Sequence, residues 1–420
     1  MTLEGTENML LSASPRAGQL AQQQSGPDGY AAFIPKPLPP APPLNLSGGL
    51  GGLLERASNS LGRLDGLSRG LDPDRLLYMY VRKEAVLSSQ IEGTQSTLTE
   101  LLQYENSEAS GVPVEDVREV SRYVSALRFA MDQIGGGFPL SLRLIRETHG
   151  VLMADGRGAE QAPGEFRRTQ NWIGGTRPST ARFVPPPPHE LMRVLGDLER
   201  FIVEGAATPI VKAGLAHAQF ETIHPFLDGN GRLGRLLITM ILCAERTLAQ
   251  PFLYLSLYFK QHRDDYYAAL QRVRSDGDWE GWMAYYLEGV DWTARQATAT
   301  TIQLLDLFRA DRERVIGASG GASTLRIYEE MQRRVIVSIR RVSEATAVSI
   351  PTVTSGLKRL QEMGIAREIT GRTYGRLFAY DRQLEILNRT DDLSESAHER
   401  PSREDVWREG FDRAEPPGEP

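Results

Sequence analysis

The 420-residue sequence contains a single cysteine, Cys243, so no disulfide can form within the chain. Cys243 lies in the apolar run 236–244 and is expected to be a small core residue. No apolar run approaches the ~20 residues that a membrane-spanning helix requires. The first residues are acidic and lack the pattern of a signal peptide. These absences predict a cytoplasmic protein that makes no contact with a membrane.

The chain also lacks an excess of positive charge. It holds 54 Asp and Glu residues against 48 Lys and Arg, a net charge of −6, so the molecule as a whole is not a polyanion binder. Segment 331–380 is the exception, because nine Lys and Arg residues stand there against three Glu residues. The length is enough for two or three domains.

Helical periodicity dominates the spacing of the apolar residues and predicts a mainly α fold. Helices are expected from Pro73 onward and over 53–71 (with breaks at its glycines), 114–134, 139–153, 190–204 and 209–223. The proline-rich residues 33–44 predict an extended polyproline segment lying along the surface.

Residues 224–235, with the sequence HPFLDGNGRLGR, are the most informative segment. The apolar positions that follow have helical spacing and predict a helix that begins near Gly231. Arg232 and Arg235 then lie on one face of the first turn, where a cation costs roughly 0.3–1 kcal/mol because the helix N-terminus is already partly positive. Free backbone N–H groups, this positive helix end and two arginines together predict an anion-binding site.

A candidate base and a candidate metal ligand lie beside this anion site. His224 has an ordinary pKa near ~6.5 and can accept a proton at neutral pH. Asp228 offers the hard oxygen that Mg²⁺ prefers when nucleotide phosphates carry it. The pattern predicts phosphate chemistry in which a nucleotide is bound and a hydroxyl is activated. The alternative is an ordinary turn before a buried helix, with His224 packed in the core, but such a helix has no use for two arginines at its start.

This segment resembles the signature of the Fic family, HPFx[D/E]GNGRxxR, and matches it at every defined position. The resemblance implies that AMP is transferred from ATP to a Ser, Thr or Tyr hydroxyl of a protein. It implies that His224 is the base and that Asp228 holds Mg²⁺ on the phosphates. It also implies that Gly229, Asn230 and Gly231 form an anion hole. Arg232 and Arg235 would hold the outer phosphates.

A second motif, SSQIEG, begins at Ser88. Ser88 and Glu92 are four residues apart and would share one face of a helix. On its own the pair could be an exposed pair on a helix surface. Together with Gly93 it resembles the inhibitory motif [S/T]xxxE[G/N] of Fic proteins. That resemblance implies that Glu92 pairs with Arg235 and blocks the γ-phosphate, because a carboxylate and a phosphate compete for one guanidinium group.

Two further segments bear on the substrates. Residues 166–184 predict a β-hairpin closed by a glycine-containing loop. In the Fic family this region is a flap whose edge holds the target protein by strand addition, although an ordinary connecting hairpin has the same pattern. Tyr266 and Tyr267 correspond to a tyrosine pair that lines the adenine and ribose pocket in related proteins, and packing in the core is an equal alternative.

The C-terminal part has its own pattern. Helix, turn, helix and a strand–loop–strand unit follow one another over 342–380, which resembles the winged helix of bacterial Fic proteins. DNA contact is expected through Thr352, Thr354, Lys358 and Arg376. A docking or dimerisation module is the alternative, and the oligomeric state, including a homodimer, stays open.

The expected fold class is therefore mainly α: a helical Fic fold with a β-hairpin flap, plus a C-terminal winged helix-turn-helix domain. The expected divisions are a disordered tail (1–30), an N-terminal helical segment with the inhibitory motif (31–105), the Fic core (106–300), a linker helix (301–330), the winged helix (331–385) and a second disordered tail (386–420).

The function that we predict is that of a protein adenylyltransferase which uses ATP and Mg²⁺ and is autoinhibited by Glu92. One alternative is a de-AMPylating or bifunctional Fic enzyme, in which Glu92 positions water. Another is transfer of phosphate or of a different phosphate-bearing group. An alternative from a different class is a DNA-binding regulator with a minor catalytic role.

Overall fold

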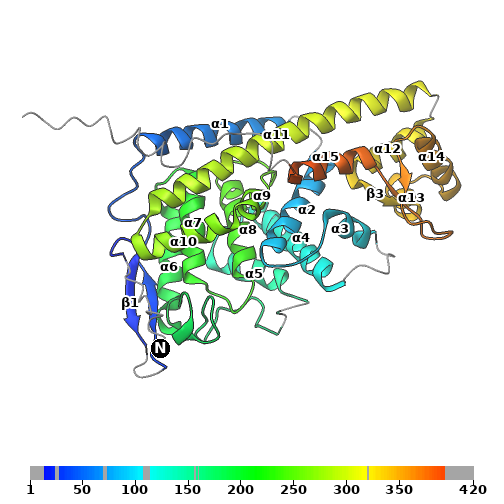
Figure 1. The fold of residues 1–420 in the computed structure, drawn as a ribbon. Helices are drawn as coiled ribbons and strands as arrows, with labels where there is room; N and C mark the ends of the chain where they lie inside the picture. Colours follow the sequence, from blue (N-terminus) through cyan, green and yellow to red (C-terminus); the bar gives the residue numbers. More distant parts are fainter. Residues whose placement is uncertain are drawn as a thin grey trace, which may run out of the picture.

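The computed structural model describes residues 14–23, 28–69, 73–106, 114–155, 158, 160–318 and 321–392. The fold is mainly helical (Figure 1), as predicted. Its centre is α7 (Pro209–Ile223), in which all residues from Ile210 to Ile223 are buried, and α8 (Asn230–Ala244), which packs against it. Among the described helices none is long and apolar enough to cross a membrane.

The remaining core helices surround this pair. They are α4 (Val114–Gly135), α5 (Leu142–Leu152), α6 (Pro188–Glu204), α9 (Ser256–Gln261) and α10 (Arg263–Asp276). The 39-residue α11 (Trp279–Gly317) runs along one side of the molecule, with α1 (Gly49–Arg69) packed beside it (Figure 1). Trp279 and Trp282 of α11 are buried, and Cys243 is half-buried at the edge of the core, close to expectation. Helix α1 is continuous, so the predicted breaks at its glycines are wrong.

Helix α2 (Pro73–Ile91) carries most of the second motif and lies between the core and the C-terminal part. It packs against α4 and α9 on one side and against α12 (Ala322–Arg334) on the other. The short α3 (Leu98–Glu105) follows, with a capping box at Thr97 and Glu100. The motif helix is therefore in contact with both halves of the chain.

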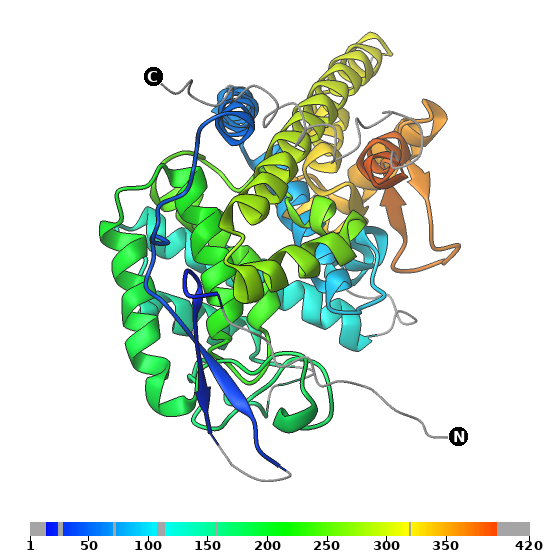
Figure 2. The ribbon, with the colours of Figure 1, turned by 60° about the vertical axis from the view of Figure 1, so that its left-hand side comes forward.

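The N-terminal segment corrects two predictions. Strands β1 (Gly18–Gln22) and β2 (Ala31–Pro35) form an antiparallel pair, so the described part of the predicted 1–30 tail is ordered and residues 33–35 are not polyproline. Figure 2 shows this hairpin crossing the face of the core. Phe33 packs on Phe183, and its backbone N–H donates to the Val184 carbonyl. These long-range contacts explain an ordered segment that local composition could not predict.

The flap contains less strand than predicted. Its pairing is an antiparallel bridge between Ile173 and Phe183, with a 3₁₀ turn at Pro178–Thr180 between them. Before Ile173, the side chains of Arg167 and Asn171 turn inward toward the segment that precedes α8. The turn of the predicted hairpin is thus present, with a single bridge in place of two paired strands.

The C-terminal part contains α12, β3 (Ile336–Ser338), α13 (Ile339–Thr346), α14 (Ile350–Glu362), β4 (Arg367–Glu368), β5 (Leu377–Ala379) and α15 (Asp381–Asp392). The three strands form an antiparallel sheet in the order β3-β5-β4. The predicted helix–turn–helix and strand–loop–strand elements are present, while the winged-helix assignment stays a prediction.

Three predicted boundaries in this part are wrong. Helix α11 continues past residue 301, so no linker helix begins there. The C-terminal module begins with α12 rather than at 331, because α12 packs against α13 and α14. Residues 386–392 belong to α15 rather than to a tail, and 393–420 lie outside the described residues.

Candidate active site

The site is built around the loop that joins α7 to α8. Helix α7 ends at His224, whose φ of 49° and ψ of 61° place it in the left-handed region. The side chain of Asn230 closes the loop, because its Oδ1 accepts from the Phe226 N–H at 2.9 Å and its Nδ2 donates to the Phe226 carbonyl at 2.8 Å. The predicted anion hole can therefore use the backbone N–H of Asn230, while its side chain has a structural role.

Two flap residues that sequence reasoning missed hold this loop from the other side. Arg167 donates from Nε to the His224 carbonyl at 3.0 Å, and Asn171 donates from Nδ2 to the same carbonyl at 3.0 Å. Arg167 also donates to the Pro186 carbonyl at 2.6 Å. A buried arginine in a loop has no sequence signal of its own, since its acceptors are backbone carbonyls far along the chain.

The His224 side chain has the charge state that a base requires. Burial lowers its pKa to about 4, and the positive charges of Arg274 and Arg167 act in the same direction. The imidazole is therefore neutral at pH 7 and can accept a proton. The second histidine near the loop, His149, stacks on Phe226 with ring centroids 3.7 Å apart, and its ring nitrogens bond to the Asp228 carbonyl and the Gly164 N–H.

The N-terminus of α8 is open to an anion. No side chain caps it, and its N-cap Gly229 has a φ of 77°. Asp228 precedes this residue, with Oδ1 accepting from the Gly229 N–H at 2.6 Å and the side chain 41% exposed. A Cβ on Gly231 would stand 2.2 Å from the Glu92 Oε1, so only glycine permits that carboxylate here. The glycines of the motif thus allow a close approach of negative charge to the helix end.

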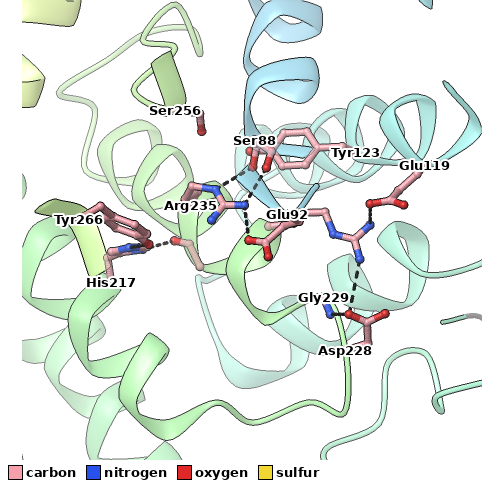
Figure 3. Close-up of polar contacts among 12 residues, drawn as sticks. Ser88, Glu92, Glu119, Tyr123, His217, Asp228, Gly229, Arg235, Ser256 and Tyr266 are labelled. Carbon is pink, nitrogen blue, oxygen red and sulfur yellow. Dashed lines mark hydrogen bonds and ion pairs between the residues drawn. The ribbon is translucent and has the colours of Figure 1, made fainter. Parts of the chain in front are cut away.

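Arg235 is held by the second motif, as predicted (Figure 3). Its Nη2 lies 2.8 Å from the Glu92 Oε1, and its Nε donates to the Ser88 Oγ at 2.9 Å. Burial alone would raise the pKa of Glu92, but the Arg235 charge outweighs it and the pKa lies below its ordinary value. Glu92 lies in the turn that follows α2, and Gly93 has a φ of 102° there. The turn, rather than a shared helix face, directs the carboxylate to α8.

Arg232 is held by a different carboxylate. Its Nη1 lies 2.6 Å from the Glu119 Oε1 of α4, and its Nη2 lies 3.7 Å from the Asp228 Oδ1 (Figure 3). Both side chains of the Arg232–Glu119 pair are nearly buried, at 5% and 9% exposure. Glu119 was not predicted, although a single glutamate among the apolar positions 117, 120 and 124 of α4 was a usable signal.

The predicted tyrosine pair is divided. Tyr266 is buried and its hydroxyl bonds to the His217 Nε2 at 2.8 Å, so it packs in the core. Tyr267 is 36% exposed, and Arg263 lies over its ring. Burial raises the pKa of Tyr267, and the Glu92 charge acts in the same direction. Tyr267 is therefore the one of the two that can meet a ligand.

The model of the Fic/DOC family N-terminal region matches residues 52–132, and the Fic/DOC family model matches residues 139–242. The chain therefore contains a Fic domain, preceded by the N-terminal region that the Fic/DOC family shares. The first matched region includes residues 88–93, and the second includes the whole of the 224–235 motif.

Relatives with assigned names are similar to this Fic protein over part of their length. It is 30% identical over 193 residues to protein adenylyltransferase Fic of Drosophila grimshawi, covering 45% of this chain and 37% of that protein. It is 38% identical over 118 residues to protein adenylyltransferase Fic of Aedes aegypti, covering 27% and 21%. The chain thus spans much less than two thirds of these relatives. A crystal structure of a Fic family protein from Desulfovibrio desulfuricans shares the fold, with a TM-score of 0.52 and 21% identity over 80% of this chain and 97% of that chain.

Proposed function

We propose that this Fic protein is a protein adenylyltransferase, which transfers AMP from ATP to a Ser, Thr or Tyr hydroxyl of a target protein or of itself. One arrangement carries the proposal. His224, with its neutral imidazole, is the C-cap residue of α7. The N-terminus of α8 follows without a side-chain cap, and Arg232 and Arg235 lie in the first turns of α8. The name of the relatives, protein adenylyltransferase Fic, supports ATP as the donor.

The proposed reaction is a single displacement at phosphorus. The hydroxyl oxygen of the target attacks the α-phosphorus and forms a P–O bond, while the bond from that phosphorus to the αβ-bridging oxygen breaks and diphosphate leaves. His224 accepts the hydroxyl proton at Nε2, because the Nδ1 side of its ring is buried. The α8 backbone N–H groups and the two arginines stabilise the charge on the phosphate oxygens.

Asp228 fits the role of an Mg²⁺ ligand that is shared with the nucleotide. Mg²⁺ is commonly bound by one or two carboxylates together with substrate phosphates. Asp228 meets this description, because its partly exposed carboxylate lies beside the α8 N-terminus. No cluster of three or more His, Cys, Asp or Glu that could hold an ion by itself occurs in the described part of the chain. Bound with ATP, the ion would neutralise phosphate charge.

Glu92 makes the enzyme autoinhibited. Its carboxylate lies over Gly231 and on Arg235, so it takes the positions that the outer phosphates of ATP would use. ATP that binds while Glu92 stays in place cannot engage Arg235 through its γ-phosphate. Charge-assisted pairs of this kind contribute roughly 1.5–3 kcal/mol.

Two exposed surfaces support the macromolecular partners that we propose. The target protein docks along the flap 166–184, next to the His224 carbonyl that Arg167 and Asn171 hold. DNA is the second partner, at 342–376, because Thr352 and Lys358 of α14 are exposed and Tyr374 in the loop between β4 and β5 is 87% exposed. Thr354 contributes less, since its hydroxyl donates to the Ile350 carbonyl.

The direct test is to incubate the full-length chain with α-labelled ATP and Mg²⁺ and to look for labelled protein. Wild type, Glu92→Gly and Glu92→Gly/His224→Ala are compared. Label is expected on Glu92→Gly alone, or more strongly on it than on the other two. Asp228→Ala in the Glu92→Gly background should lose Mg²⁺-dependent transfer, with partial recovery at high Mg²⁺. Label from γ-labelled ATP instead would indicate a phosphotransferase, and release of AMP from prelabelled protein would indicate the reverse activity.

A further inference from the structure

The flap carries charge of one sign only. Residues 166–184 contain four arginines and no aspartate or glutamate, in a chain whose net charge is −6. The four are Arg167, Arg168, Arg177 and Arg182. A surface that binds protein without regard to charge would not need such an excess, so the distribution of these charges in space matters.

Two buried positive charges lie beside His224, Arg167 of the flap and Arg274 of α10. Arg167 and Arg274 are 3% and 7% exposed, and the hydrogen bonds that they donate go to backbone carbonyls and to the Thr222 hydroxyl. Within the described residues neither forms a salt bridge with a carboxylate. Both charges are close enough to His224 to lower its pKa.

The carboxyl of Glu221, whose charge acts on Arg274, neutralises that arginine incompletely. Burial raises the pKa of Glu221 to about 7, so this group is partly protonated at neutral pH. Burial also lowers the pKa of Arg167 and of Arg274 to about 10, which still leaves both side chains charged. The floor of the docking surface therefore keeps a positive potential.

The outer layer of the flap adds exposed charges of the same sign. Arg168 and Arg182 are exposed and form no ion pair in the part of the chain that the structure describes. Arg182 lies beside the bridged turn, 3.2 Å from the position of a Cβ on Gly174, and its charge acts on Arg274 beneath it. Arg177 pairs with Asp28 at 3.0 Å, but both side chains are more than half exposed, and such pairs contribute little.

We infer that the segment which receives AMP is an acidic peptide segment, with Asp or Glu residues flanking the modified hydroxyl. The inference rests on the proposed function and specifies the substrate class of the same site. Exposed charges at the rim of a docking surface act mainly on the rate of encounter and on partner choice. Acidic residues of the target meet Arg168 and Arg182, while the buried pair supplies a constant positive field at the hydroxyl. Trp172, 38% exposed next to Asn171, adds apolar contact.

The experiment uses full-length Glu92→Gly chain and three synthetic peptides of equal length. Each has a central Ser, Thr and Tyr, flanked by Asp and Glu, by Gln and Gly, or by Lys and Arg. Transfer of labelled AMP and binding of fluorescent peptide are both measured, at low salt and at 0.5 M salt. The acidic peptide should show a kcat/KM and an affinity about tenfold higher than the neutral one, and salt should remove most of the difference.

Charge reversal on the flap is the decisive variant. Arg168→Glu/Arg182→Glu should lose the acidic preference and favour the basic peptide. The matched control is Arg309→Glu/Arg312→Glu, two exposed arginines near the C-terminal end of α11, which should keep the wild-type order of peptides. Arg312 lies 3.9 Å from Glu329 of α12, which places this control next to the C-terminal module.

The binding readout separates this inference from the proposed function. A charge preference in peptide binding without AMP transfer would support the acidic partner and contradict the adenylyltransferase. Equal binding of the three peptides, or an acidic preference that survives the flap reversal, would overturn the inference. Displacement of the acidic peptide by a single-stranded oligonucleotide that binds more tightly to the same arginines would also overturn it, in favour of a nucleic acid.

Discussion

Glu92 covers Gly231, with its Oε1 2.2 Å from where a Cβ on that glycine would stand. The carboxylate is bound as an anion by two features together, the positive end of α8 and the Arg235 guanidinium at 2.8 Å. The Glu92 carboxylate thus lies where these two features could also bind a phosphate. This relationship leads to two predictions that differ in sign.

Removal of the Glu92 carboxylate should activate the enzyme. Glu92→Gly frees Arg235 and the α8 N-terminus, and at ~1.4 kcal/mol per decade the lost pair corresponds to a roughly ten- to hundredfold increase in self-labelling. Glu92→Gln keeps the shape of the side chain but loses its charge. Its self-labelling rate should lie between those of wild type and Glu92→Gly. Arg235→Ala should not activate, because it also removes the γ-phosphate contact. Self-labelling by Glu92→Gly at the wild-type rate would show that the Glu92–Arg235 pair is not inhibitory.

A methyl group on Gly231 should displace Glu92 without activating the enzyme. Gly231→Ala forces the carboxylate away, since 2.2 Å is far below a tolerable contact. It also fills the space that a phosphate oxygen needs at the helix end. We expect weaker ATP binding than in wild type by calorimetry and at least a tenfold loss of labelling relative to Glu92→Gly. Labelling equal to that of Glu92→Gly would mean that phosphate does not approach this glycine.

Glu119 should act as a positioning residue for Arg232. The buried pair at 2.6 Å fixes the guanidinium with Nη2 toward Asp228. Glu119→Ala leaves a buried charge without its partner, which typically costs 3–5 kcal/mol of stability. Glu119→Gln, which keeps an oxygen acceptor, should stay folded, with a KM for ATP about tenfold higher and a smaller change in kcat. If Glu119→Gln raises Tm and leaves KM unchanged, Glu119 has no role in nucleotide binding.

The pH dependence of transfer should reflect the lowered pKa of His224. A base must be deprotonated, and a folded-state value of about 4 keeps His224 neutral well below its ordinary 6.5. Transfer should therefore persist between pH 6.5 and 5 and decline as the pH falls toward 4. Arg274→Gln removes the larger of the two positive-charge effects on His224, so the pKa of His224 should rise. As the pH is lowered, the activity of this variant should therefore begin to decline at a higher pH than that of its parent.

The informative measurement is the ratio of the two rates, Arg274→Gln over its parent, at saturating ATP and each pH. The titration of ATP itself cancels in this ratio, and circular dichroism confirms that both proteins remain folded. The ratio should fall as the pH is lowered from 7 to 5. A constant ratio would mean that Arg274 does not act on the base.

The sequence predicted most reliably where one local pattern sets the geometry. The 224–235 motif fixed the positions of a base, a helix end and two arginines within twelve residues, and the Glu92–Arg235 contact followed from a resemblance. Residues that act across the fold were not predictable in this way. Arg167 and Glu119 are buried and paired with groups far away in the chain, so their spacing carries no information about their partners.

The errors in the predicted fold have the same cause. Residues 18–22 are polar and looked disordered, yet they form a strand because β2 and the Phe33–Phe183 contact provide a place for it. The boundary predicted at 301 was wrong because α11 has no helix-breaking residue there. Local composition does not indicate that one helix packs against two regions of the core.

The C-terminal module should influence catalysis through α2 as well as bind DNA. The Lys83 Nζ of α2 donates to the Leu387 carbonyl at 2.6 Å, and Arg334 lies over the Tyr78 ring at 4.7 Å. A chain that ends at residue 318 removes these contacts from the helix that leads directly to Glu92. We expect a lower Tm and, because Glu92 is held less firmly, severalfold more labelling than wild type.

A double-mutant comparison isolates this effect. The same truncation in the Glu92→Gly background should leave labelling unchanged or lower, because no inhibitory carboxylate remains to be released. By contrast, Lys358→Glu/Arg376→Glu in the full-length chain should lose salt-dependent DNA binding and keep the wild-type labelling rate. If truncation changes labelling by the same factor in both backgrounds, the module stabilises the core generally, and α2 does not transmit its state to Glu92.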